Sequence, residues 1–195
     1  MRAGADEKSS LRRQLRQRWL ASPLPGAVAG QVLQHIVDVC GSAHPRAAVA
    51  GFIRHGHEVD VEPLLAELKV SGVTVALPKV EGDDLLFLRW DAAELIEGAY
   101  GLLEPLNAGA VSLAELAVVL VPAMACSVDG TRLGRGGGYY DRALSKLPAS
   151  ARLICVVGDD ALMPAGSIPQ EPHDVRMHAI ATPTRLLEVA DLQAN

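Results

Sequence analysis

One stretch of the sequence joins glycine, arginine and acidic residues in a spacing that suits a phosphate ligand. Residues 131–144 read TRLGRGGGYYDRAL, and their glycines are Gly134, Gly136, Gly137 and Gly138. Glycines let backbone N–H groups approach a polyphosphate closely, while Arg132 and Arg135 offer forked, charged donors. The Asp141 carboxylate is of the kind that holds Mg²⁺ beside phosphate oxygens. This stretch is therefore the first candidate for chemistry.

Three interpretations of the stretch are open from its letters alone. A glycine-rich surface loop that needs positive φ angles would read the same way. The two common nucleotide fingerprints do not fit, because GxGxxG requires a third glycine where Tyr139 stands and the P-loop requires a Gly-Lys-Ser/Thr ending. The third interpretation is a phosphate cradle of another design, with the following helix starting at the ligand.

The composition is that of an ordinary globular chain with an aliphatic core. Of its 195 residues, 49% are hydrophobic and 21% charged, and the length predicts a single domain, residues 1–195. Aromatic residues make up only 4%, so Leu, Val, Ile and Ala must build the core. Tyr139 and Tyr140 are two of only three tyrosines, and both stand beside the glycines.

Charge is distributed unevenly along the chain. The net charge is −5, but six of the 18 basic residues lie in the first 20 positions, against two of the 23 acids. The remainder holds 12 basic and 21 acidic residues. The two early acids and the lack of a serine-rich context disfavour a transit peptide, and the acidic remainder disfavours a nucleic-acid role. Residues 1–21 are instead expected to include a basic helix.

Cysteine usage and hydropathy bear on the compartment. Cys40, Cys126 and Cys155 are odd in number, far apart and in no CxxC pair, which favours a reduced, cytoplasmic chain. The sequence lacks a signal-peptide core, and the run LAVVLVPAMAC is too short to span a bilayer. We therefore expect a cytoplasmic protein that binds neither membrane nor nucleic acid.

Apolar periodicity predicts alternating helices and strands. Helices are expected over 7–21, from after Pro25-Gly26 to Cys40 with Gly41 as the stop, over 60–70 and over 139–147. Strands are expected over 47–54, 73–78, 85–90, 116–123 and 152–158. This alternation predicts an α/β fold of three layers, α/β/α, with a mostly parallel, Rossmann-like central sheet. Such sheets bind ligands beyond the carboxyl ends of their strands, and the glycine stretch begins shortly after the 116–123 strand.

The stretch TRLGRGGGYYDRAL resembles the signature of the 5-formyltetrahydrofolate cyclo-ligases, also called methenyltetrahydrofolate synthetases. Glycines, arginines and Tyr-Tyr-Asp are in register, and the resemblance extends over nearly the whole chain. It implies ATP-dependent conversion of 5-formyltetrahydrofolate to 5,10-methenyltetrahydrofolate, with release of ADP and phosphate, through phosphorylation of the formyl oxygen. It also implies Mg²⁺ as cofactor and ATP as co-substrate. Monomer and homodimer both stay open.

The resemblance implies an ATP site built from two segments. KSSLR near the N-terminus places Lys8 and Arg12 as phosphate ligands on one helix face, where the alternative is a solvated basic face. Arg135 and Tyr139 are expected to contact ATP and to be catalytic, with Arg135 on the transferring phosphoryl group. The other implied ATP contacts are Arg132, Leu133, Gly134, Gly136, Gly137, Gly138 and Tyr140.

The resemblance also implies a folate site. Glu58, in GHEVDVEPLL, matches the acid that binds the pterin, whose adjacent donors suit a carboxylate. Without the resemblance, a surface role would be preferred for this residue. Tyr100, in GAYGLLEP, is expected to line the site, and Glu104 either lines it or caps a turn. From the glycine stretch, the implied folate contacts are Arg135, Gly136 and Tyr139.

Asp141 and Asp174 are the implied Mg²⁺ ligands. Asp174 lies in EPHDVRMHAIATP, far from Asp141 along the chain, as expected of a site assembled at strand ends. The adjacent His173 has no recognised zinc spacing. His55 and His57 are expected to be exposed loop imidazoles.

Three places depart from the family pattern. Gly137 stands where many members carry Lys, His178 where many carry Asp, and the segment 157–164 lacks an aromatic residue and Gln common after the last strand. Gly137 and the 157–164 segment motivate one alternative, a non-catalytic protein that binds nucleotide or folate. An isomerase or thioester-type transferase with Glu58 or Glu104 as nucleophile is another, which independence of ATP would favour.

Overall fold

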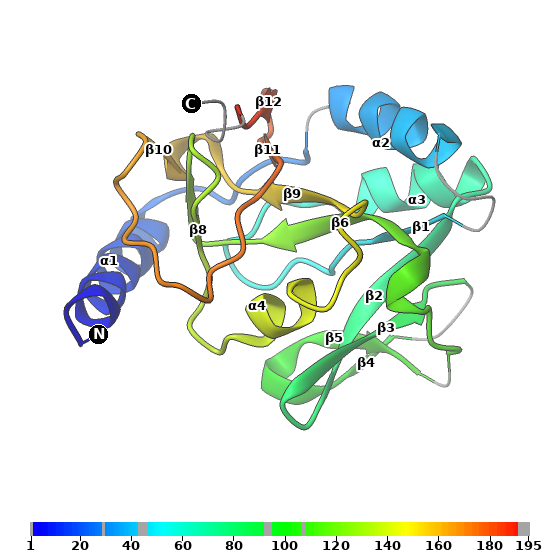
Figure 1. The fold of residues 1–195 in the computed structure, drawn as a ribbon, viewed down its shortest axis with the longest axis horizontal. Helices are drawn as coiled ribbons and strands as arrows, with labels where there is room; N and C mark the ends of the chain where they lie inside the picture. The colour runs from blue at the N-terminus through cyan, green and yellow to red at the C-terminus, as the bar shows by residue number, and fades with distance from the viewer. Residues whose placement is uncertain (1, 29, 43–46, 92–94, 107, 191–195) are drawn as a thin grey trace.

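A seven-stranded sheet runs through the centre of the computed structural model, which describes residues 2–28, 30–42, 47–91, 95–106 and 108–190 (Figure 1). In spatial order the strands are β12 (Leu186–Glu188), β11 (Ala179–Ala181), β9 (Arg152–Val156), β6 (Leu116–Pro122), β1 (Ala48–Ala50), β2 (Thr74–Glu81) and β3 (Asp84–Arg89). The five inner strands are parallel, and the two edge strands are antiparallel to their neighbours. The expected mostly parallel sheet is confirmed.

Chain order reverses in the middle of this sheet. From β1 the chain adds β2 and β3 on one side, and then returns to add β6, β9 and β11 on the other. Strands β1 and β6, which flank the reversal, pair in parallel. Strands β6 and β9 end on the side of the molecule where the first helix lies (Figure 1). Such a switch point leaves a crevice at the carboxyl ends of the strands, where ligands bind.

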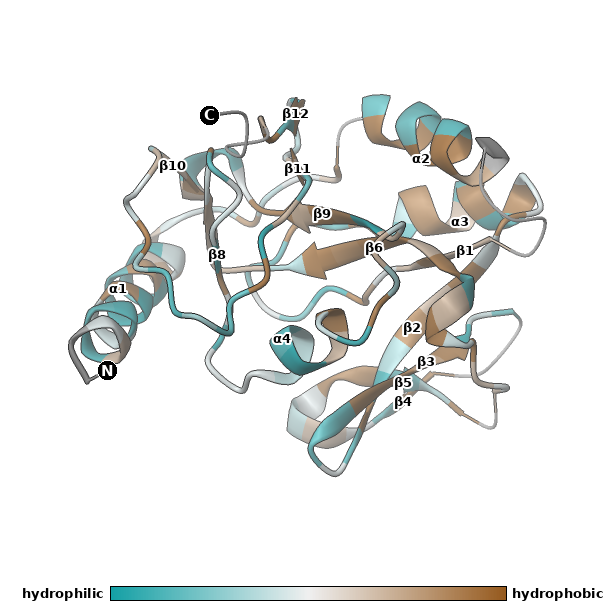
Figure 2. Ribbon diagram, viewed as in Figure 1, coloured by the Kyte–Doolittle hydropathy of each residue, from teal (hydrophilic) through white to brown (hydrophobic). Residues whose placement is uncertain are grey.

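Helices cover both faces of the sheet, which makes three layers. α2 (Gln31–Ser42) and α3 (Glu62–Val70) cover one face, and the short α4 (Tyr139–Leu144) covers the other (Figure 1). Alternate residues of β6 serve the two faces, because Val118 and Leu120 belong to one core cluster and Val119 and Val121 to the other. Burial on both faces explains why the inner strands are continuous apolar runs, visible as brown ribbon in Figure 2.

The first helix, α1 (Arg2–Ala21), lies beyond the carboxyl ends of β6 and β9 (Figure 1). Leu11, Leu15 and Trp19, spaced by four residues, form the stripe that packs on the core, so most of the helix presents hydrophilic residues (Figure 2). Among the described residues, no helix combines the length and apolar character needed to cross a membrane.

Several element boundaries differ from the sequence prediction. β1 covers only 48–50 of the expected 47–54, since the backbone after Ala50 leaves the strand and borders a cavity described below. α2 continues through Gly41 to Ser42, and α4 ends at Leu144 instead of residue 147. Pro63 lies in the first turn of α3, as expected, where its missing N–H breaks no helical hydrogen bond.

Two small sheets escaped the sequence prediction. β4 (Leu95–Glu97) and β5 (Leu103–Pro105) form an antiparallel hairpin, and β7 (Ala125–Ser127) pairs with both β8 (Arg132–Leu133) and β10 (Leu162–Met163). These strands are only two or three residues long, so they are too short to carry a readable apolar alternation. The short 3₁₀ turns are Ala99–Gly101, Leu113–Glu115 and Asp159–Ala161.

Candidate functional site

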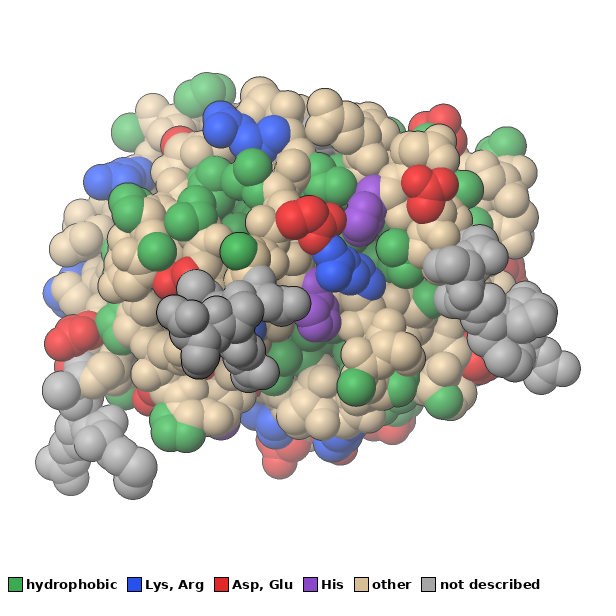
Figure 3. Space-filling view, turned by 45° about the horizontal axis from the view of Figure 1, so that its top comes forward, with side chains coloured by type: hydrophobic (Ala, Val, Ile, Leu, Met, Phe, Trp, Pro, Cys, Tyr) green, Lys and Arg blue, Asp and Glu red, His purple; other side chains and the backbone are tan. Residues whose placement is uncertain are grey.

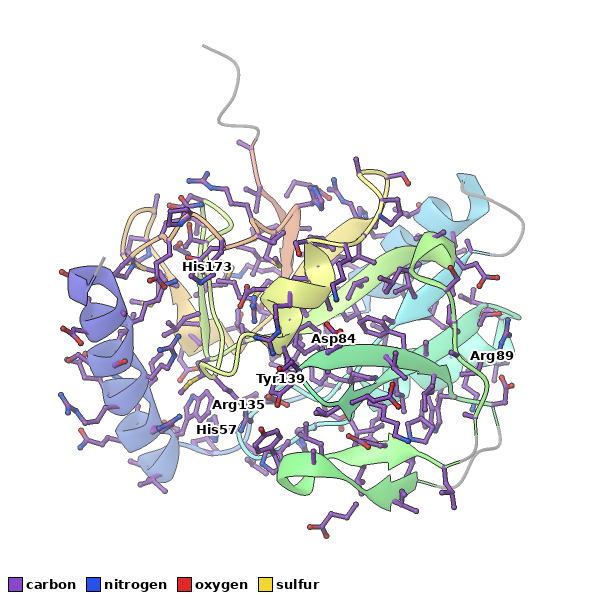
Figure 4. All side chains as sticks on the ribbon, turned by 60° about the horizontal axis from the view of Figure 1, so that its bottom comes forward. His57, Asp84, Arg89, Arg135, Tyr139 and His173 are labelled. Atoms are coloured by element: carbon purple, nitrogen blue, oxygen red, sulfur yellow. The ribbon has the colours of Figure 1, made fainter. Side chains whose placement is uncertain are left out.

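A cavity of about 610 Å³ lies at the carboxyl ends of β1, β2 and β6. Val80 of β2, Pro122 of β6 and Phe52, which follows β1, contribute apolar wall. α1, the glycine stretch, the segment after β1 and the region near residue 174 contribute the charged groups. Figure 4 shows Arg135 and Tyr139 between α1 and the β4–β5 hairpin. A concave site with apolar walls and a few convergent polar groups is typical of small-molecule binding.

The glycine stretch forms one wall of the cavity as the loop between β8 and α4. Gly136 has a φ of +106° and Gly138 a φ of +69°, conformations that glycine adopts without steric cost. The loop begins from a fixed point, because Met124 N donates to the Leu133 carbonyl at 2.8 Å and β8 pairs with β7. Gly138 is the N-cap residue, directly before α4. The loop thus has a defined shape that depends on its glycines.

Arg132 lies buried beneath this loop. Its Nη2 donates to Asp141 Oδ1 at 2.6 Å, and its Nη1 donates to the Pro122 carbonyl at 3.3 Å. Among the described residues, neither the Arg132 Nε nor the buried Tyr140 hydroxyl has a hydrogen-bond partner. Burial, reinforced by Glu58, raises the pKa of Tyr140, so its phenol keeps its proton at neutral pH. Buried donors without partners are uncommon, and both residues line the cavity.

α1 brings Lys8 and Arg12 to the cavity from one helix face. Lys8 Nζ lies 2.6 Å from Asp174 Oδ2 and 2.9 Å from Glu171 Oε2, and the residue is 4% exposed. Arg12 Nε donates to the Gly134 carbonyl at 2.8 Å, which ties the helix to the glycine loop. Burial lowers the pKa of Arg12, and Glu171 partly opposes that shift. The two residues therefore join α1 to two segments of the cavity wall, the acids near residue 174 and the glycine loop.

Arg135 and Glu58 form an ion pair between the glycine loop and the segment after β1. Arg135 Nε donates to Glu58 Oε1 at 3.0 Å, and Arg135 Nη2 donates to the His55 carbonyl at 2.5 Å. Glu58 Oε2 accepts from the His55 N–H at 3.0 Å. The Glu58 side chain is buried, whereas that of Arg135 is 43% exposed. The guanidinium is therefore the member of the pair with room to move.

Tyr139 connects the glycine loop to the β4–β5 hairpin. Its hydroxyl lies 2.8 Å from the Tyr100 hydroxyl, and the two rings meet edge to face with centroids 5.9 Å apart. The hydrogen bond with Tyr100 raises the pKa of Tyr139, so this phenol also stays neutral. The Arg142 guanidinium lies 4.9 Å from the centre of the Tyr139 ring. The ring thus contacts both the Tyr100 ring and the Arg142 guanidinium.

Acidic groups gather at the cavity end near Lys8. Glu171, His173 and Asp174 each offer a ligand atom within 4.8 Å of the others, and Asp174 Oδ2 also accepts from the Glu171 N–H at 2.7 Å. Asp141 lines the same cavity but lies outside that group, where it pairs with Arg132. The structure thus places Asp141 and Asp174 on one cavity, and their joint binding of Mg²⁺ stays a prediction.

Most of the residues predicted from the sequence line this cavity. They are Lys8, Arg12, Glu58, Tyr100, Arg132, Gly134, Arg135, Gly136, Gly137, Gly138, Tyr139, Tyr140, Asp141 and Asp174. Leu133 does not line it, because its side chain is buried in the core. Glu104 is also absent from the lining, and its carboxylate accepts instead from the Val80 N–H at 3.0 Å. The individual roles of these residues stay predictions.

The prediction for two histidines was wrong, and the apolar wall of the cavity was not predicted. His57 stacks on Trp19 with ring centroids 5.3 Å apart, and His55 lines the cavity, so the expectation of two exposed imidazoles was wrong. Phe52 and Ile53 escaped attention, although their place directly after β1 was the available signal. His178 lies outside the cavity lining, at the start of β11, where its Nδ1 accepts from the Leu153 N–H at 2.9 Å.

Comparison with known proteins gives one consistent result. The model of the 5-formyltetrahydrofolate cyclo-ligase family matches residues 5–183. A 5-formyltetrahydrofolate cyclo-ligase of Mycolicibacterium smegmatis is 39% identical over 145 residues, which cover 70% of this chain and 74% of that protein. The protein of the same name from Escherichia coli is 32% identical over 146 residues, which cover 72% and 80% respectively.

Two solved structures share the fold. The 5,10-methenyltetrahydrofolate synthetase of Aquifex aeolicus superposes with a TM-score of 0.72 at 24% identity, over 96% of this chain and 95% of that one. That of Mycoplasma pneumoniae gives a TM-score of 0.61 at 21% identity, over 89% and 96%. With a family match over most of its length, the chain belongs to the 5-formyltetrahydrofolate cyclo-ligase family.

Proposed function

We propose that this chain is an ATP-dependent 5-formyltetrahydrofolate cyclo-ligase, which forms 5,10-methenyltetrahydrofolate, ADP and phosphate. One observation carries the proposal beyond family membership. The glycine loop, the basic face of α1 and the Glu58 carboxylate converge on a single cavity at the switch point of the sheet. Such a cavity offers N–H groups and cations that can bind phosphate, together with a carboxylate that can accept hydrogen bonds from the pterin.

The chemistry requires activation of a poor leaving group. The formyl oxygen attacks the γ-phosphorus, a new O–P bond forms, and the bond to ADP breaks. N10 of the folate then bonds to the formyl carbon and loses its proton to solvent, while the C–O bond breaks and phosphate leaves. The attacking carbonyl oxygen carries no proton, so the first step needs no general base. Phosphoryl transfer asks the protein mainly for alignment and neutralisation of charge.

The chain's own residues supply that alignment. Arg135 contacts the transferring phosphoryl group, and the N–H groups of residues 136–138 receive negative charge as it develops. Lys8, Arg12 and Arg132 hold the remaining phosphates. Tyr139 lies between the nucleotide and the folate, and Tyr100 lines the folate side with Glu58. In this proposal the chain is a single domain whose α1 is part of the ATP site.

Three cations of the site, Lys8, Arg132 and Arg135, are already paired with carboxylates, whereas Arg12 donates to the Gly134 carbonyl. Lys8 pairs with Asp174 and Glu171, Arg132 with Asp141, and Arg135 with Glu58. To bind these cations, the phosphates must therefore replace carboxylates that are already paired with them. When the pterin binds to Glu58, the 43% exposed Arg135 guanidinium leaves this carboxylate and turns to phosphate.

The residues of the site also suit Mg²⁺. Asp141 and Asp174 are hard oxygen donors on the cavity that would hold the phosphates, and Mg²⁺ commonly binds one or two carboxylates together with phosphate oxygens. We assign these two residues as its ligands. When bound, the ion would neutralise charge on the phosphates of ATP.

A compartment and a class of partner follow from the same proposal. All three cysteines are free, which fits a reducing environment, and we place the enzyme in the cytoplasm. Its partners are the two small-molecule substrates.

An absorbance assay with purified protein tests the proposal. Incubation with 5-formyltetrahydrofolate and MgATP is expected to produce the methenyl chromophore, with one ADP released per product and no product when ATP is omitted. Substrate binding without product would identify a non-catalytic homologue. Turnover of the folate without ATP would point to isomerase or transferase chemistry.

A further inference from the structure

The hairpin of residues 95–105 forms part of the cavity wall. Its tip and second strand contribute Tyr100, Leu102 and Leu103 to the lining, and Tyr100 hydrogen-bonds to Tyr139 of the glycine loop. Figure 4 shows the hairpin beside the labelled Tyr139, on the opposite side of the site from α1. The position of this hairpin therefore sets the shape of one side of the cavity.

This hairpin has little structure of its own to hold it in place. Among the residues that the structure describes, β4 and β5 pair only with each other, over three residue pairs, and a two-stranded hairpin in isolation is marginal in water. Two of its apolar side chains stay partly in solvent, with Ile96 39% and Leu103 42% exposed. Its position therefore depends on contacts with the main sheet, which β5 makes with β2.

Glu104 makes one of these contacts. The residue is only 4% exposed, and its Oε1 accepts from the Val80 N–H of β2 at 3.0 Å. β1 pairs with β2 only as far as Ala76, so this later part of β2 lies beyond the parallel pairing, and the carboxylate supplies a partner for its backbone. Because Val80 itself lines the cavity, the bond joins the hairpin directly to the cavity wall.

The opposite side of the Glu104 carboxylate packs against the hairpin's own backbone. A Cβ atom added to Gly98 would lie 2.3 Å from both Cδ and Oε2 of Glu104, so only glycine leaves room for this side chain. Gly98 N also donates to the Leu102 carbonyl at 2.7 Å, which closes the turn. The carboxylate is thus clamped between β2 and the base of the hairpin tip.

The tip that Glu104 supports is conformationally strained. Tyr100 has a φ of +58°, in the left-handed region that costs a residue with a side chain free energy, and Gly101 follows with +72°. Such a conformation persists only where surrounding contacts fix it. At one end of the tip those contacts are the Glu104 clamp, and at the other the hydrogen bond to Tyr139.

We propose that Glu104 is a positioning residue, which holds the 95–105 hairpin against β2 and so presents Tyr100 and Leu102 to the folate. It does not act on the reacting atoms, since its carboxylate lies outside the cavity lining. This proposal rests on the proposed function for the identity of the substrate. The clamp itself can be measured without turnover.

Kinetics of three variants test the positioning role. Glu104→Ala leaves the Val80 N–H unpaired and frees the hairpin, so KM for 5-formyltetrahydrofolate is expected to rise about tenfold or more, while KM for ATP changes less than about twofold. Glu104→Gln keeps an acceptor oxygen of the same length and is expected to restore KM to within about threefold of the parent. Glu115→Ala is the matched control, because that carboxylate also fixes a loop through a backbone N–H, that of Ser112 at 3.1 Å, but does not line the cavity.

Hydrogen exchange separates this inference from the proposed function. In Glu104→Ala, amides of residues 95–104 are expected to exchange at least about tenfold faster, with β6 and β9 unchanged. An unchanged hairpin, or equal rises in both KM values, would overturn the proposal even if the parent protein is fully active. If the parent forms no methenyl product, the proposed function fails, and faster exchange in the hairpin still establishes the clamp. Should Glu104→Ala not fold, Gly98→Ala displaces the same carboxylate and is expected to give the same exchange pattern.

Discussion

Arginine–carboxylate pairs lie at both ends of the parallel strands, but only the pair at the carboxyl end borders the cavity described above. At the carboxyl end, buried Arg132 pairs with Asp141 on the wall of the 610 Å³ cavity. At the amino end, Arg152 pairs with Glu188, and His35 approaches the same carboxylate at 3.8 Å. Figure 3, which turns the side bearing α2 and β12 toward the viewer, shows acidic, basic and histidine side chains meeting on that surface. Glu188 there is 54% exposed, whereas Asp141 is 22% exposed.

That contrast shows that charge pairing alone does not identify a site. Both ends contain an arginine with a buried Nε that lacks a hydrogen-bond partner among the described residues. What distinguishes the carboxyl end is convergence, because α1, the segment after β1, the glycine loop and the region near residue 174 meet there around one cavity. Strand direction and the reversal of chain order produce that convergence.

Replacement of Arg135 should have the largest effect on activity, and it is the strictest test of the difference between the two strand ends. Arg135→Ala is expected to lower kcat roughly a thousandfold or more, with a much smaller change in ATP affinity, if it stabilises the transferring phosphoryl group as arginine fingers do. Arg152→Ala at the amino end is the matched control and should leave kcat within about twofold. Equal losses in the two variants would erase the functional difference between the ends.

Removal of Lys8 is the next largest change. Lys8→Ala leaves Asp174 and Glu171 without their buried cation, so KM for ATP is expected to rise roughly tenfold to a hundredfold, and the protein to lose stability. Lys146→Ala breaks an exposed pair with Asp84, in which both side chains are more than half exposed, and should change neither. Steady-state kinetics and thermal unfolding distinguish the two. An unaltered KM for ATP in Lys8→Ala would remove α1 from the nucleotide site.

Replacement of Asp141 tests its assignment as a Mg²⁺ ligand. Asp141→Asn is expected to raise the Mg²⁺ concentration for half-maximal activity roughly tenfold, because one hard ligand is weakened. Asp84→Asn, an exposed acid paired with Lys146, serves as the control in the same titration. Full activity of the Asp141 variant at low Mg²⁺ would rule out its metal role.

The smallest effect concerns a carboxylate that serves the fold. Although burial opposes the shift, hydrogen bonds from Ser127, Gly166 and Thr131 hold the pKa of Asp129 down at about 2. Its charge therefore stabilises the protein above about pH 4, and that contribution is lost as pH falls toward 2. Asp129→Asn should lower Tm by roughly 2–4 °C at pH 7, and by less at pH 3. A difference in Tm that does not shrink with pH would contradict this account.

The sequence predicts those elements of the fold that are long enough to show an apolar pattern, and it does not predict the shorter ones. The continuous apolar runs at 116–122 and 152–156 predicted strands that are buried on both faces, but β4 and β5 are too short to show alternation. The spacing of Lys8 and Arg12 predicted a shared helix face, and both line the cavity. The inward turn of Glu104 and the stacking of His57 on Trp19 depend on contacts between distant segments, which no local pattern encodes.

The central claim is that the N–H groups of the glycine loop hold the phosphates of ATP. A crystal structure of the protein with MgATP tests it most directly. We expect the β- and γ-phosphates within hydrogen-bond reach of the backbone of residues 134–138, with Arg135 turned from Glu58 toward the γ-phosphate. A nucleotide bound elsewhere, with the loop and the Arg135–Glu58 pair unchanged, would contradict the account.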